Sequence, residues 1–296
     1  MAAKRGPFRN RLELSAYLVL RTIFRLLPVR LADALGRRAG LLYRRLDARR
    51  RRIVQGNLAL AFPEKTPAEV DSLAREVFAH FGSLAADLLR SETEPVESLL
   101  ARVEVVGFEH ARAAAASGRG VFFATPHMGS WEWALLVTGA NGISVTVVAR
   151  PLDNPLLDAR LTAMREKTGC QVVSKRDAAR TLLKTLRSGG LVGILTDQRA
   201  RPPDAVVVPF FGRPASTTSS VARLGAKTGA LVLPAVCLRT GPGRYRFTFS
   251  EPFDAMTLAP EEREAEPLTA RLTAIVERQV REAPGQWLWL HDRWRL

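Results

Sequence analysis

The amino-acid sequence predicts an α/β protein with a mainly parallel sheet flanked by helices, preceded by a helical region at the amino end. From residue 103 onward, short apolar runs alternate with segments of helical spacing, which is the pattern of consecutive strand–helix–strand units. Before residue 93, the apolar residues recur mainly at helical spacing instead. The chain has 296 residues, of which 47% are hydrophobic and 25% charged, so it can bury a substantial core.

The first periodic segment covers residues 11–27. Its polar side chains recur every fourth residue and form one stripe: Glu13, Tyr17, Arg21 and Arg25. The longest charge-free run, residues 14–20, is seven residues long, whereas a membrane-spanning helix needs roughly 20. A secretory signal also fits poorly, because the apolar centre is interrupted and no clean cleavage site follows. We therefore expect a helix that lies in a membrane interface, with an amphipathic helix packed on the main domain as the alternative.

Basic residues are concentrated at the amino end. Residues 1–60 contain fifteen Lys and Arg against three acidic residues, and the whole chain carries a formal charge of +15. Such a field attracts nucleic acid, anionic lipid or an acidic protein. Nucleic acid is disfavoured because no zinc-finger, RNA-binding or basic-zipper pattern is present. Near an apolar helix, each basic residue contributes about 1 kcal/mol to binding an anionic leaflet. We predict a basic, amphipathic, membrane-associating region over residues 1–60 and an α/β domain over residues 61–296, with a helical lead-in at residues 67–92.

The elements of the second region follow from its apolar runs and from the residues that end helices. Strands are expected at residues 103–106, 121–125, 144–149, 171–173, 191–196, 231–238 and 245–250, the last one antiparallel to its predecessor. Helices are expected at residues 110–117, 155–167, 178–186, 219–227 and 263–283, and another begins at residue 131. The polar and aromatic stretch between residues 197 and 218 is expected to be a loop.

Residues 120–133 are the stretch around which the rest of the chain is predicted to be arranged. Residues 121–125 are apolar, β-branched or aromatic, which predicts a buried strand, and Pro126 helps to end that strand. A helix is predicted from Trp131 onward. His127 would therefore lie between the carboxyl end of a strand and the amino end of a helix, where α/β proteins form ligand crevices.

Glu132 follows His127 by five positions and can approach it only if the residues between them form a turn. Gly129 makes such a turn easy. A carboxylate that accepts from one imidazole nitrogen leaves the other nitrogen free to act as a base, as deprotonation of a hydroxyl requires. From these residues alone, a catalytic pair and an ordinary loop histidine beside a solvated glutamate both fit the pattern.

Other chemistries lack their sequence motifs. No G-x-S-x-G stretch is present, which disfavours a serine hydrolase, and residues 225–228 lack the glycines of a phosphate-binding loop. The four histidines lack ligand-pair spacing, so no metal site is predicted. Cys170 and Cys237 belong to no paired motif and are expected to be buried thiols in a reducing compartment.

Residues 127–132, His-Met-Gly-Ser-Trp-Glu, resemble the His-x4-Asp/Glu motif of the lysophospholipid acyltransferase-like superfamily. In its Glu form, and with the sequence around it, this stretch resembles the lipid A biosynthesis acyltransferase family of the late, lauroyl/myristoyl type. Further matching segments follow the same order as in that family: residues 57–64, 150–155, 196–198, 209–212 and 287–291. Together they extend the resemblance from about residue 12 to the end of the chain.

The resemblance implies that His127 is the general base on the acceptor hydroxyl and that Glu132 orients it. Candidate substrate-binding residues follow predicted strands or line the lip of the expected cleft: Arg150, Asn154, Asp197, Gln198, Phe211, Gly212 and Thr217. Arginine suits bidentate phosphate binding, although an isolated arginine is also common on any surface. Two adjacent phenylalanines are more often part of a core than of a substrate-binding wall, but the preceding loop, rich in arginine and proline, favours one of them facing an acyl chain. The aromatic tail of Trp287, Trp289 and Trp294 suits either a membrane interface or packing against the sheet.

The activity that the resemblance implies is transfer of a fatty acyl chain from acyl carrier protein to a hydroxyl of a lipid A precursor. No cofactor is expected, because the thioester is already activated. The basic balance of the chain suits an acidic carrier protein and an anionic glycolipid acceptor at the cytoplasmic face of the bacterial inner membrane. One alternative is an acyltransferase acting on phosphatidylinositol mannoside or another membrane lipid. A second alternative is a membrane-bound lipid-binding protein of the same fold that has no catalytic activity.

Overall fold

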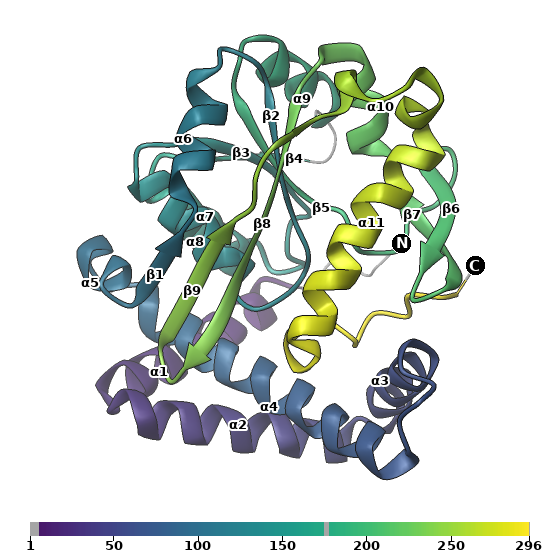
Figure 1. The fold of residues 1–296 in the computed structure, drawn as a ribbon. Coiled ribbons are helices and arrows are strands. Elements are labelled where there is room, and N and C mark those ends of the chain that lie inside the picture. The colour runs from purple at the N-terminus through teal and green to yellow at the C-terminus, as the bar shows by residue number, and fades with distance from the viewer. Residues whose placement is uncertain (1–5, 175–177, 296) are drawn as a thin grey trace.

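A twisted sheet forms the centre of the molecule in the computed structural model, which describes residues 6–174 and 178–295 (Figure 1). Its strands, in spatial order, are β1 (Val103–Val106), β9 (Arg244–Phe249), β8 (Leu231–Gly241), β2 (Val121–Thr125), β5 (Leu191–Leu195), β3 (Val145–Ala149) and β4 (Gln171–Ser174), with β10 (Phe253–Asp254) paired to β8. Strand β2 lies between β5 and β8 and is parallel to both, and β3 is parallel to β5 and β4. The predicted mainly parallel sheet is confirmed, and so is the antiparallel pairing of β9 with β8.

Helices cover both faces of this sheet. They are α5 (Val96–Leu100), α6 (Phe108–Ala116), α7 (Trp131–Ala140), α8 (Pro155–Glu166), α9 (Ala178–Arg187), α10 (Ser220–Thr228) and α11 (Ala265–Glu282). Alternate residues of β2 face opposite cores: Val121 and Phe123 pack with α6, α7 and α8, whereas Phe122 and Ala124 pack with α9, α10 and α11. Burial on both faces explains the continuous apolar run in the sequence. Both cysteines are buried and free, as predicted, and burial raises the pKa of each thiol.

The prediction of a loop between residues 197 and 218 is wrong, because this stretch contains a β-hairpin. Strands β6 (Ala205–Phe210) and β7 (Arg213–Thr218) pair antiparallel, with Phe210 opposite Arg213. Phe211 and Gly212 form the two-residue connection, and both have positive φ, at 52° and 67°. Positive φ at both central positions suits the twist of a hairpin, but Phe rarely adopts it, so the turn carries a weak sequence signal. Three short 3₁₀ turns were also not predicted: η1 (Ala255–Thr257), η2 (Pro260–Arg263) and η3 (Pro284–Gln286).

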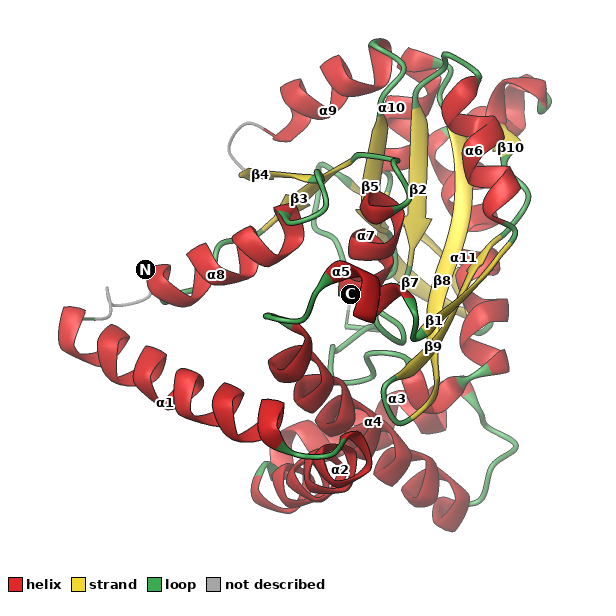
Figure 2. Ribbon diagram, turned by 90° about the vertical axis from the view of Figure 1, so that its left-hand side faces the viewer, coloured by secondary structure: helices red, strands yellow, loops and turns green. Residues whose placement is uncertain are grey.

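The first four described helices form a layer at the lower edge of the sheet: α1 (Pro7–Leu26), α2 (Val29–Leu46), α3 (Ala48–Ala61) and α4 (Pro67–Ser91). The predicted lead-in helix is therefore confirmed as α4. Thr66 and Glu69 start it with reciprocal side-chain-to-backbone hydrogen bonds, a capping box. Figure 2 shows α1 leaving the body of the molecule and converging with α8 at its far end. Among the described residues, no helix is both long and apolar enough to cross a membrane.

Helices α2 and α4 cross in backbone contact because glycines line their interface. A Cβ atom at Gly40 would lie 2.0 Å from the carbonyl oxygen of Phe78, and one at Gly82 would lie 2.1 Å from that of Gly36. Neither distance is sterically possible, so no residue with a side chain fits without moving the helices apart. These glycines hold α2 against the long helix that supports the sheet.

A buried charged cluster joins this helical layer to the sheet. Asp33 on α2 accepts hydrogen bonds from Ser83 (2.6 Å) and from Arg239 on β8 (2.5 Å). Asp87 on α4 accepts from the hydroxyl of Tyr245 on β9, at 2.7 Å. Burial raises the pKa of Asp87, although Tyr245 and Arg239 act in the opposite direction. Because the partners come from α2, α4 and two strands, the cluster fixes how the two layers sit on each other.

Candidate active site

The turn between β2 and α7 carries His127, as the sequence predicts. Gly129 lies in this turn with φ at 57°, and a Cβ atom there would lie 2.0 Å from the carbonyl oxygen of Cys237. The same oxygen accepts a hydrogen bond from the N–H of Ser130, at 2.8 Å. Glycine is therefore required both for the left-handed conformation and for the close approach to β8. The turn holds His127 at the carboxyl end of β2, just before α7 begins.

Asp197 is the hydrogen-bonding partner of His127. It follows β5, and because β5 is parallel to β2 their carboxyl ends meet at one edge of the sheet. One carboxylate oxygen lies 2.7 Å from Nδ1 of His127, and the other accepts the backbone N–H of His127 at 2.8 Å. This two-point contact fixes the orientation of the imidazole ring. The side chain of His127 retains 16% exposure, whereas that of Asp197 retains 1%.

The carboxylate of Asp197 is held in its charged form. Burial alone would raise the pKa of Asp197, but the interactions with His127 and the hydrogen bond from the indole N–H of Trp287 outweigh burial and lower this pKa. The indole nitrogen of Trp287 lies 2.7 Å from Oδ2 of Asp197. A charged Asp197 facing Nδ1 favours the tautomer with the proton on Nδ1, which leaves Nε2 as the basic nitrogen.

The predicted contact between Glu132 and His127 is not present in the structure. Both oxygens of Glu132 accept hydrogen bonds from Arg165 on α8, at 2.8 Å from Nε and 2.5 Å from Nη2. The turn at Gly129 does form, but it delivers Glu132 to the first turn of α7, from which its side chain reaches α8. The orienting contact that we expected of Glu132 is made by Asp197 instead.

The final segment of the chain lies directly against the turn that carries His127, hereafter the His127 turn. The N–H of Gly129 donates to the carbonyl of Gln286 at 3.0 Å, and the N–H of Leu288 donates to the carbonyl of His127 at 2.9 Å. Met128 and Trp287 pair between these bonds as an isolated antiparallel bridge. The sequence indicated this segment only as an aromatic tail. The sequence signal that this segment belongs to the site was that residues 287–291 match the last of the family motifs, which occur here in the same order as in the family.

His291 is a second histidine near the site that the sequence analysis did not select. Its Nε2 accepts the backbone N–H of Arg199 at 3.0 Å, so this nitrogen carries no proton. Burial lowers the pKa of His291, and the nearby charge of Arg293 lowers it further. A neutral His291 therefore anchors the loop that follows Asp197.

Two predicted substrate-binding residues lie at the expected edge of the sheet. Arg150 directly follows β3 and is exposed, and β3 is separated from β2 by one strand, β5. Gln198 is half-buried and adjoins Asp197 in the chain. Both follow parallel strands on the His127 side, so they stay candidates for contact with substrate.

Asn154 has a structural role that argues against its predicted contact with substrate. Its side-chain oxygen accepts the N–H of Leu156 and caps α8, at 3.0 Å. Its amide nitrogen donates to the carbonyl of Asn10 (3.0 Å) and to a carboxylate oxygen of Glu13 (2.9 Å) on α1. The residue is 2% exposed, so its polar atoms hold two helices together.

Phe211, Gly212 and Thr217 also belong to the packed interior or the hairpin rather than to a lip of a cleft. Phe211 is 7% exposed, and its ring centroid lies 5.3 Å from that of Phe62. Gly212 completes the β6–β7 turn. Thr217 is 1% exposed and accepts a hydrogen bond from Arg293 at 2.6 Å. The sequence pattern could not distinguish these interior positions from a cleft wall.

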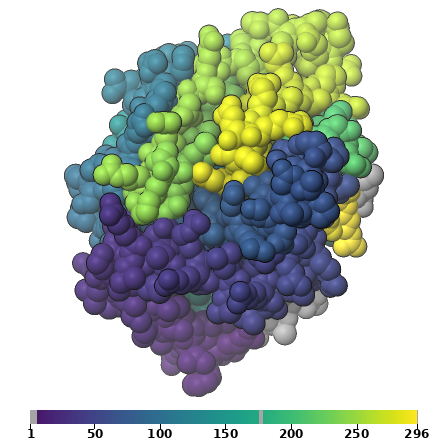
Figure 3. All heavy atoms as spheres, turned by 60° about the horizontal axis from the view of Figure 1, so that its bottom comes forward, coloured from purple at the N-terminus to yellow at the C-terminus, as the bar shows by residue number. Residues whose placement is uncertain are grey.

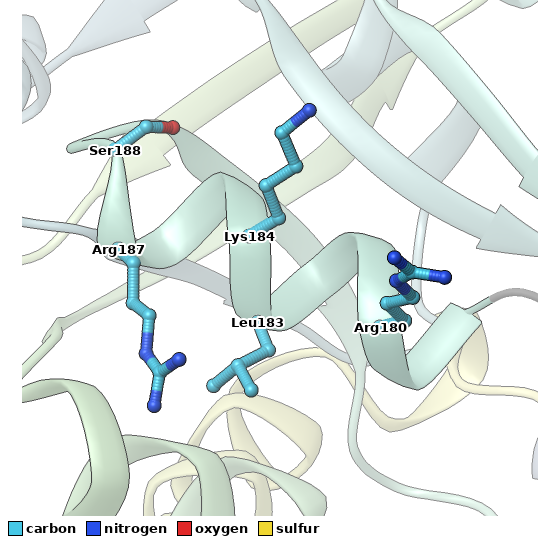
Figure 4. Close-up of a pocket in the computed structure, with 5 residues that line it drawn as sticks. All are labelled: Arg180, Leu183, Lys184, Arg187 and Ser188. Atoms are coloured by element: carbon cyan, nitrogen blue, oxygen red, sulfur yellow. The ribbon is translucent and has the colours of Figure 1, made fainter.

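Two open hollows in the surface are basic, and neither contains His127. The first has a volume of about 460 Å³ and lies along α9; Figure 4 shows it lined by Arg180, Leu183, Lys184, Arg187 and Ser188. The second, of about 470 Å³, lies between α3 and the end of the chain. Its lining residues are Arg49, Arg52, Ile53, Gly56, Asn57, Leu60, Asp292 and Arg295. Among the described residues, no three His, Cys, Asp or Glu side chains are grouped as a metal would require.

Comparisons with known proteins identify the family of this chain. The family model of bacterial lipid A biosynthesis acyltransferases matches residues 8–296, which is nearly the whole chain. The chain belongs to that family. It is 29% identical to the lipid A biosynthesis lauroyltransferase of Escherichia coli, over 91% of this chain and 87% of that protein. It is 24% identical to the lipid A biosynthesis myristoyltransferase of the same organism, over 90% of this chain and 81% of that protein. It is also 26% identical to a phosphatidylinositol mannoside acyltransferase of Mycobacterium tuberculosis, over 80% of this chain and 75% of that protein.

Membership of an acyltransferase family accounts for the chemistry that the site offers. Such an enzyme needs a base near the acceptor hydroxyl. A strand-end histidine held by a buried carboxylate has the geometry of a positioned base.

Proposed function

We propose that this acyltransferase moves a fatty acyl chain from acyl carrier protein to a hydroxyl of a lipid A precursor. Family membership supports the reaction class, and the names of the Escherichia coli relatives support lipid A as the acceptor class. The observation that carries the mechanism is the hydrogen bond from Nδ1 of His127 to Asp197. It leaves Nε2 of a partly exposed imidazole free to act as a base.

In the proposed reaction, Nε2 of His127 takes the proton of the acceptor hydroxyl while its oxygen attacks the thioester carbonyl. Asp197 holds the Nδ1–H and stabilises the imidazolium ion that forms. The tetrahedral intermediate then collapses, the carbon–sulfur bond breaks, and the proton passes from His127 to the departing thiolate. A base of this kind accelerates a reaction by about 10²–10⁴-fold. No covalent enzyme intermediate is required, because the thioester is already activated.

The oxyanion of that intermediate requires fixed hydrogen-bond donors or a nearby cation. Arg150 is our candidate, since it follows β3 at the same edge of the sheet as His127 and is exposed to an approaching ligand. It would equally suit a phosphate of the acceptor. Arg165 is unsuited to this task, because Glu132 engages it with two hydrogen bonds.

Helix α1 supports binding of residues 1–60 to the cytoplasmic face of a membrane, because its polar stripe faces the protein. Tyr17 donates to Glu92 at 2.8 Å, Arg21 lies 3.7 Å from the same carboxylate, and Asn154 donates to Glu13 at 2.9 Å. Burial and Glu92 raise the pKa of Tyr17 to about 12. A helix that packs on its own domain normally buries its apolar face. In α1 the polar stripe faces the protein and the apolar face points outward, which suits contact with a lipid surface.

The apolar side chains of α1 and α2 are correspondingly exposed. Figure 3 shows these helices gathered on the face that lies at the bottom of Figure 1. The exposed residues are Phe8, Leu12, Val19, Leu20, Ile23, Leu26, Leu31, Leu35, Leu42, Tyr43 and Leu46. Phe8 and Leu26 are 82% and 79% exposed. An apolar surface of this extent, flanked by arginines, favours an anionic membrane over water.

The hollow between α3 and the end of the chain, hereafter the α3 hollow, supports acyl carrier protein as the donor. Arg49, Arg52 and Arg295 line it, so it presents positive charge to an acidic partner. It also lies close to the catalytic machinery. Asn57 in its wall donates to the carbonyl of His291 at 2.7 Å, three residues beyond Leu288, which donates to the carbonyl of His127.

Phosphatidylinositol mannoside is the second candidate acceptor, because the mycobacterial relative named for it is about as similar to this chain as the lipid A enzymes are. A lipid-binding protein without catalytic activity is the remaining alternative. The positioned His127 and Asp197 pair argues against it, since binding alone does not require a base.

Mass spectrometry of the reaction product tests the proposal. Purified protein would be supplied with acyl carrier proteins bearing different chains and with both a lipid A precursor and phosphatidylinositol mannoside. We expect one added acyl group on the lipid A precursor and its loss in the His127→Ala variant. Acylation of the mannoside alone would select the second candidate. Absence of thioester turnover with any acceptor, by folded protein in anionic vesicles, would reject the enzyme.

A further inference from the structure

The segment from Gln286 to Leu288 connects three parts of the active site. Gln286 accepts the N–H of Gly129 with its carbonyl, and its side chain forms a pair of hydrogen bonds with the backbone of Arg239 on β8, both at 2.9 Å. Leu288 donates to the carbonyl of His127. The His127 turn is therefore held between β8 and the end of the chain. This segment lies about 160 residues further along the sequence than the turn it supports.

Within this segment, Trp287 directs its indole N–H at Asp197. Among the described residues, the carboxylate has three N–H donors: the ring and backbone of His127 and the indole of Trp287. Trp287 shares Oδ2 with the backbone N–H, so it holds the oxygen that faces away from the imidazole ring. Its own ring is 1% exposed and packs on Phe210, at a centroid distance of 5.5 Å, and on Trp289, at 4.6 Å. The donor is therefore rigid.

We propose that Trp287 is a positioning residue of the catalytic centre, which fixes the Asp197 carboxylate so that Oδ1 meets the imidazole of His127 in the productive geometry. The inference rests on the proposed role of His127 as the base. Trp287 would act through Asp197 and would not touch substrate. Its effect should therefore fall on kcat, with little change in KM.

Trp289 provides a matched control within the same segment. It is 0% exposed, and its indole also donates one hydrogen bond at 2.7 Å, to the carbonyl of Pro284. It packs against Trp287, so both side chains belong to one buried cluster. The two residues differ in the partner of the indole, which is the active-site carboxylate for one and a backbone carbonyl for the other.

The kinetic test compares Trp287→Phe with Trp289→Phe in full-length protein in vesicles. Removing a hydrogen bond to a charged group should reduce kcat by about 10-fold to 100-fold for Trp287→Phe. KM should change little, and Trp289→Phe should keep most of kcat. In an Asp197→Asn background, Trp287→Phe should add little further loss, because both changes affect one unit. Equal losses for the two tryptophan variants would assign the effect to packing and overturn the proposal.

If the Trp287→Phe variant does not fold, a substitution that keeps the bicyclic ring provides the same test. Site-specific incorporation of 3-benzothienylalanine replaces the indole N–H by sulfur and preserves the bicyclic shape. We expect the same fall in kcat from this single-atom change. Full activity of that protein would show that the N–H has no role.

Nuclear magnetic resonance tests the contact without relying on activity. In protein labelled with ¹⁵N-tryptophan, the Trp287 indole resonance, assigned by its loss in Trp287→Phe, should shift in Asp197→Asn, while that of Trp289 stays in place. An unmoved Trp287 resonance would refute the contact itself. If the resonance shifts but His127→Ala stays fully active, the contact stands and the proposed base is wrong.

Discussion

Two buried carboxylates lie near the turn that carries His127, and each has a different partner. Asp197 is 3% exposed and receives its hydrogen bonds from His127 and Trp287. Glu132 is 8% exposed and is paired with Arg165 through two hydrogen bonds. The first carboxylate holds the orientation of the imidazole ring directly. The second joins α7 to α8 and keeps the helix that follows the turn in place.

Substitution of each carboxylate by its amide separates these roles. Asp197→Asn should reduce kcat by about 10²–10⁴-fold with the fold intact, because an amide can hold His127 in the wrong tautomer. Glu132→Gln instead removes the charge that forms two hydrogen bonds with the Arg165 guanidinium, whose side chain is 16% exposed. It should lower the free energy of unfolding by about 3–5 kcal/mol, the typical cost of breaking a buried ion pair.

Kinetics and urea unfolding of both variants provide the measurement. Glu132→Gln/Arg165→Met is the control, and we expect it to recover part of the lost stability. If Glu132→Gln lowered kcat as much as Asp197→Asn while remaining fully stable, the division of roles between the two carboxylates would be refuted.

His80 on α4 predicts a specific loss of stability in acid. It is 6% exposed. Burial and the positive charge of Arg239 lower its pKa from 6.5 to about 4, although a hydrogen bond to the backbone of Gly129 acts in the opposite direction. Between these two values, the unfolded chain binds a proton that the folded protein excludes. The free energy of unfolding should therefore fall as the pH falls, by up to about 1.4 kcal/mol per unit.

Urea unfolding between pH 4 and pH 7 measures this effect. The difference in stability between the wild-type protein and His80→Gln should shrink as the pH is lowered through the window set by the pKa of His80. A difference that does not depend on pH would mean that His80 has the same pKa in the folded and unfolded protein, and the assigned pKa shift would be wrong.

At the scale of secondary-structure elements, the helical layer and the end of the chain both support the edge of the sheet that carries His127. Helix α2 packs on α4 through glycines, and the cluster of Asp33, Asp87 and Arg239 joins these helices to β8. The backbone of Arg239 is in turn held by Gln286, whose carbonyl accepts the N–H of Gly129 in the turn that carries His127. Consecutive contacts therefore run from the amino-terminal helices to His127.

Substitution of an interface glycine by alanine tests how tightly α2 and α4 are packed. Gly40→Ala places a methyl group 2.0 Å from the Phe78 carbonyl, so the helices must separate. We expect a loss of about 1–3 kcal/mol or more in the free energy of unfolding, as for overpacked cores.

Gly56→Ala is the matched control for this prediction. Gly56 is also helical, in α3, but a Cβ atom there meets nothing within 4 Å. Alanine should stabilise the protein by roughly 0.5–1 kcal/mol at that position, through helix propensity alone. Equal effects of the two substitutions in urea unfolding would show that α2 and α4 are not in close contact.

At the scale of the whole molecule, charge and apolar surface are distributed unevenly. Thirteen basic residues between residues 6 and 60 lie on α1, α2 and α3, and apolar side chains of α1 and α2 are exposed, while His127 lies at the edge of the sheet above these helices. An anionic surface and an acidic donor can therefore both be attracted to the amino-terminal side. Substitutions in the two basic hollows, on α3 and α9, can show which part of this surface attracts the acidic donor.

Charge reversal in the α3 hollow should weaken use of the carrier-bound donor. We expect Arg49→Glu/Arg52→Glu to raise KM for acyl carrier protein thioester by about 10-fold or more, since like charges oppose docking of an acidic protein. The same variant should use the corresponding coenzyme A thioester with little change. Steady-state kinetics with both donors, at several salt concentrations, provides the measurement.

The hollow on α9 supplies the control, because Arg180→Glu/Arg187→Glu changes the net charge by the same amount. An equal rise in KM for that variant would show that the overall field, and not the α3 hollow, attracts the carrier. Unchanged kinetics in both variants would remove both hollows from the donor site.

Local periodicity was enough to predict most helices and strands and the position of His127. The run at residues 121–125 is apolar throughout because β2 is covered on both faces, and Gly129 indicated the turn that follows. These features depend on residues close together in the chain. The ordered motifs extended the prediction to the acyltransferase family that the comparisons show.

Tertiary structure decided which carboxylate meets His127, because that contact joins residues 70 positions apart and depends on the parallel pairing of β2 with β5. The spacing of Glu132 suggested a contact, but the first turn of α7 directs that side chain to Arg165 on α8. Asn154 and Phe211 likewise became interior residues because α1 and α3 pack over them. Burial of a polar or aromatic side chain depends on which distant segment covers it, and local spacing does not contain that information.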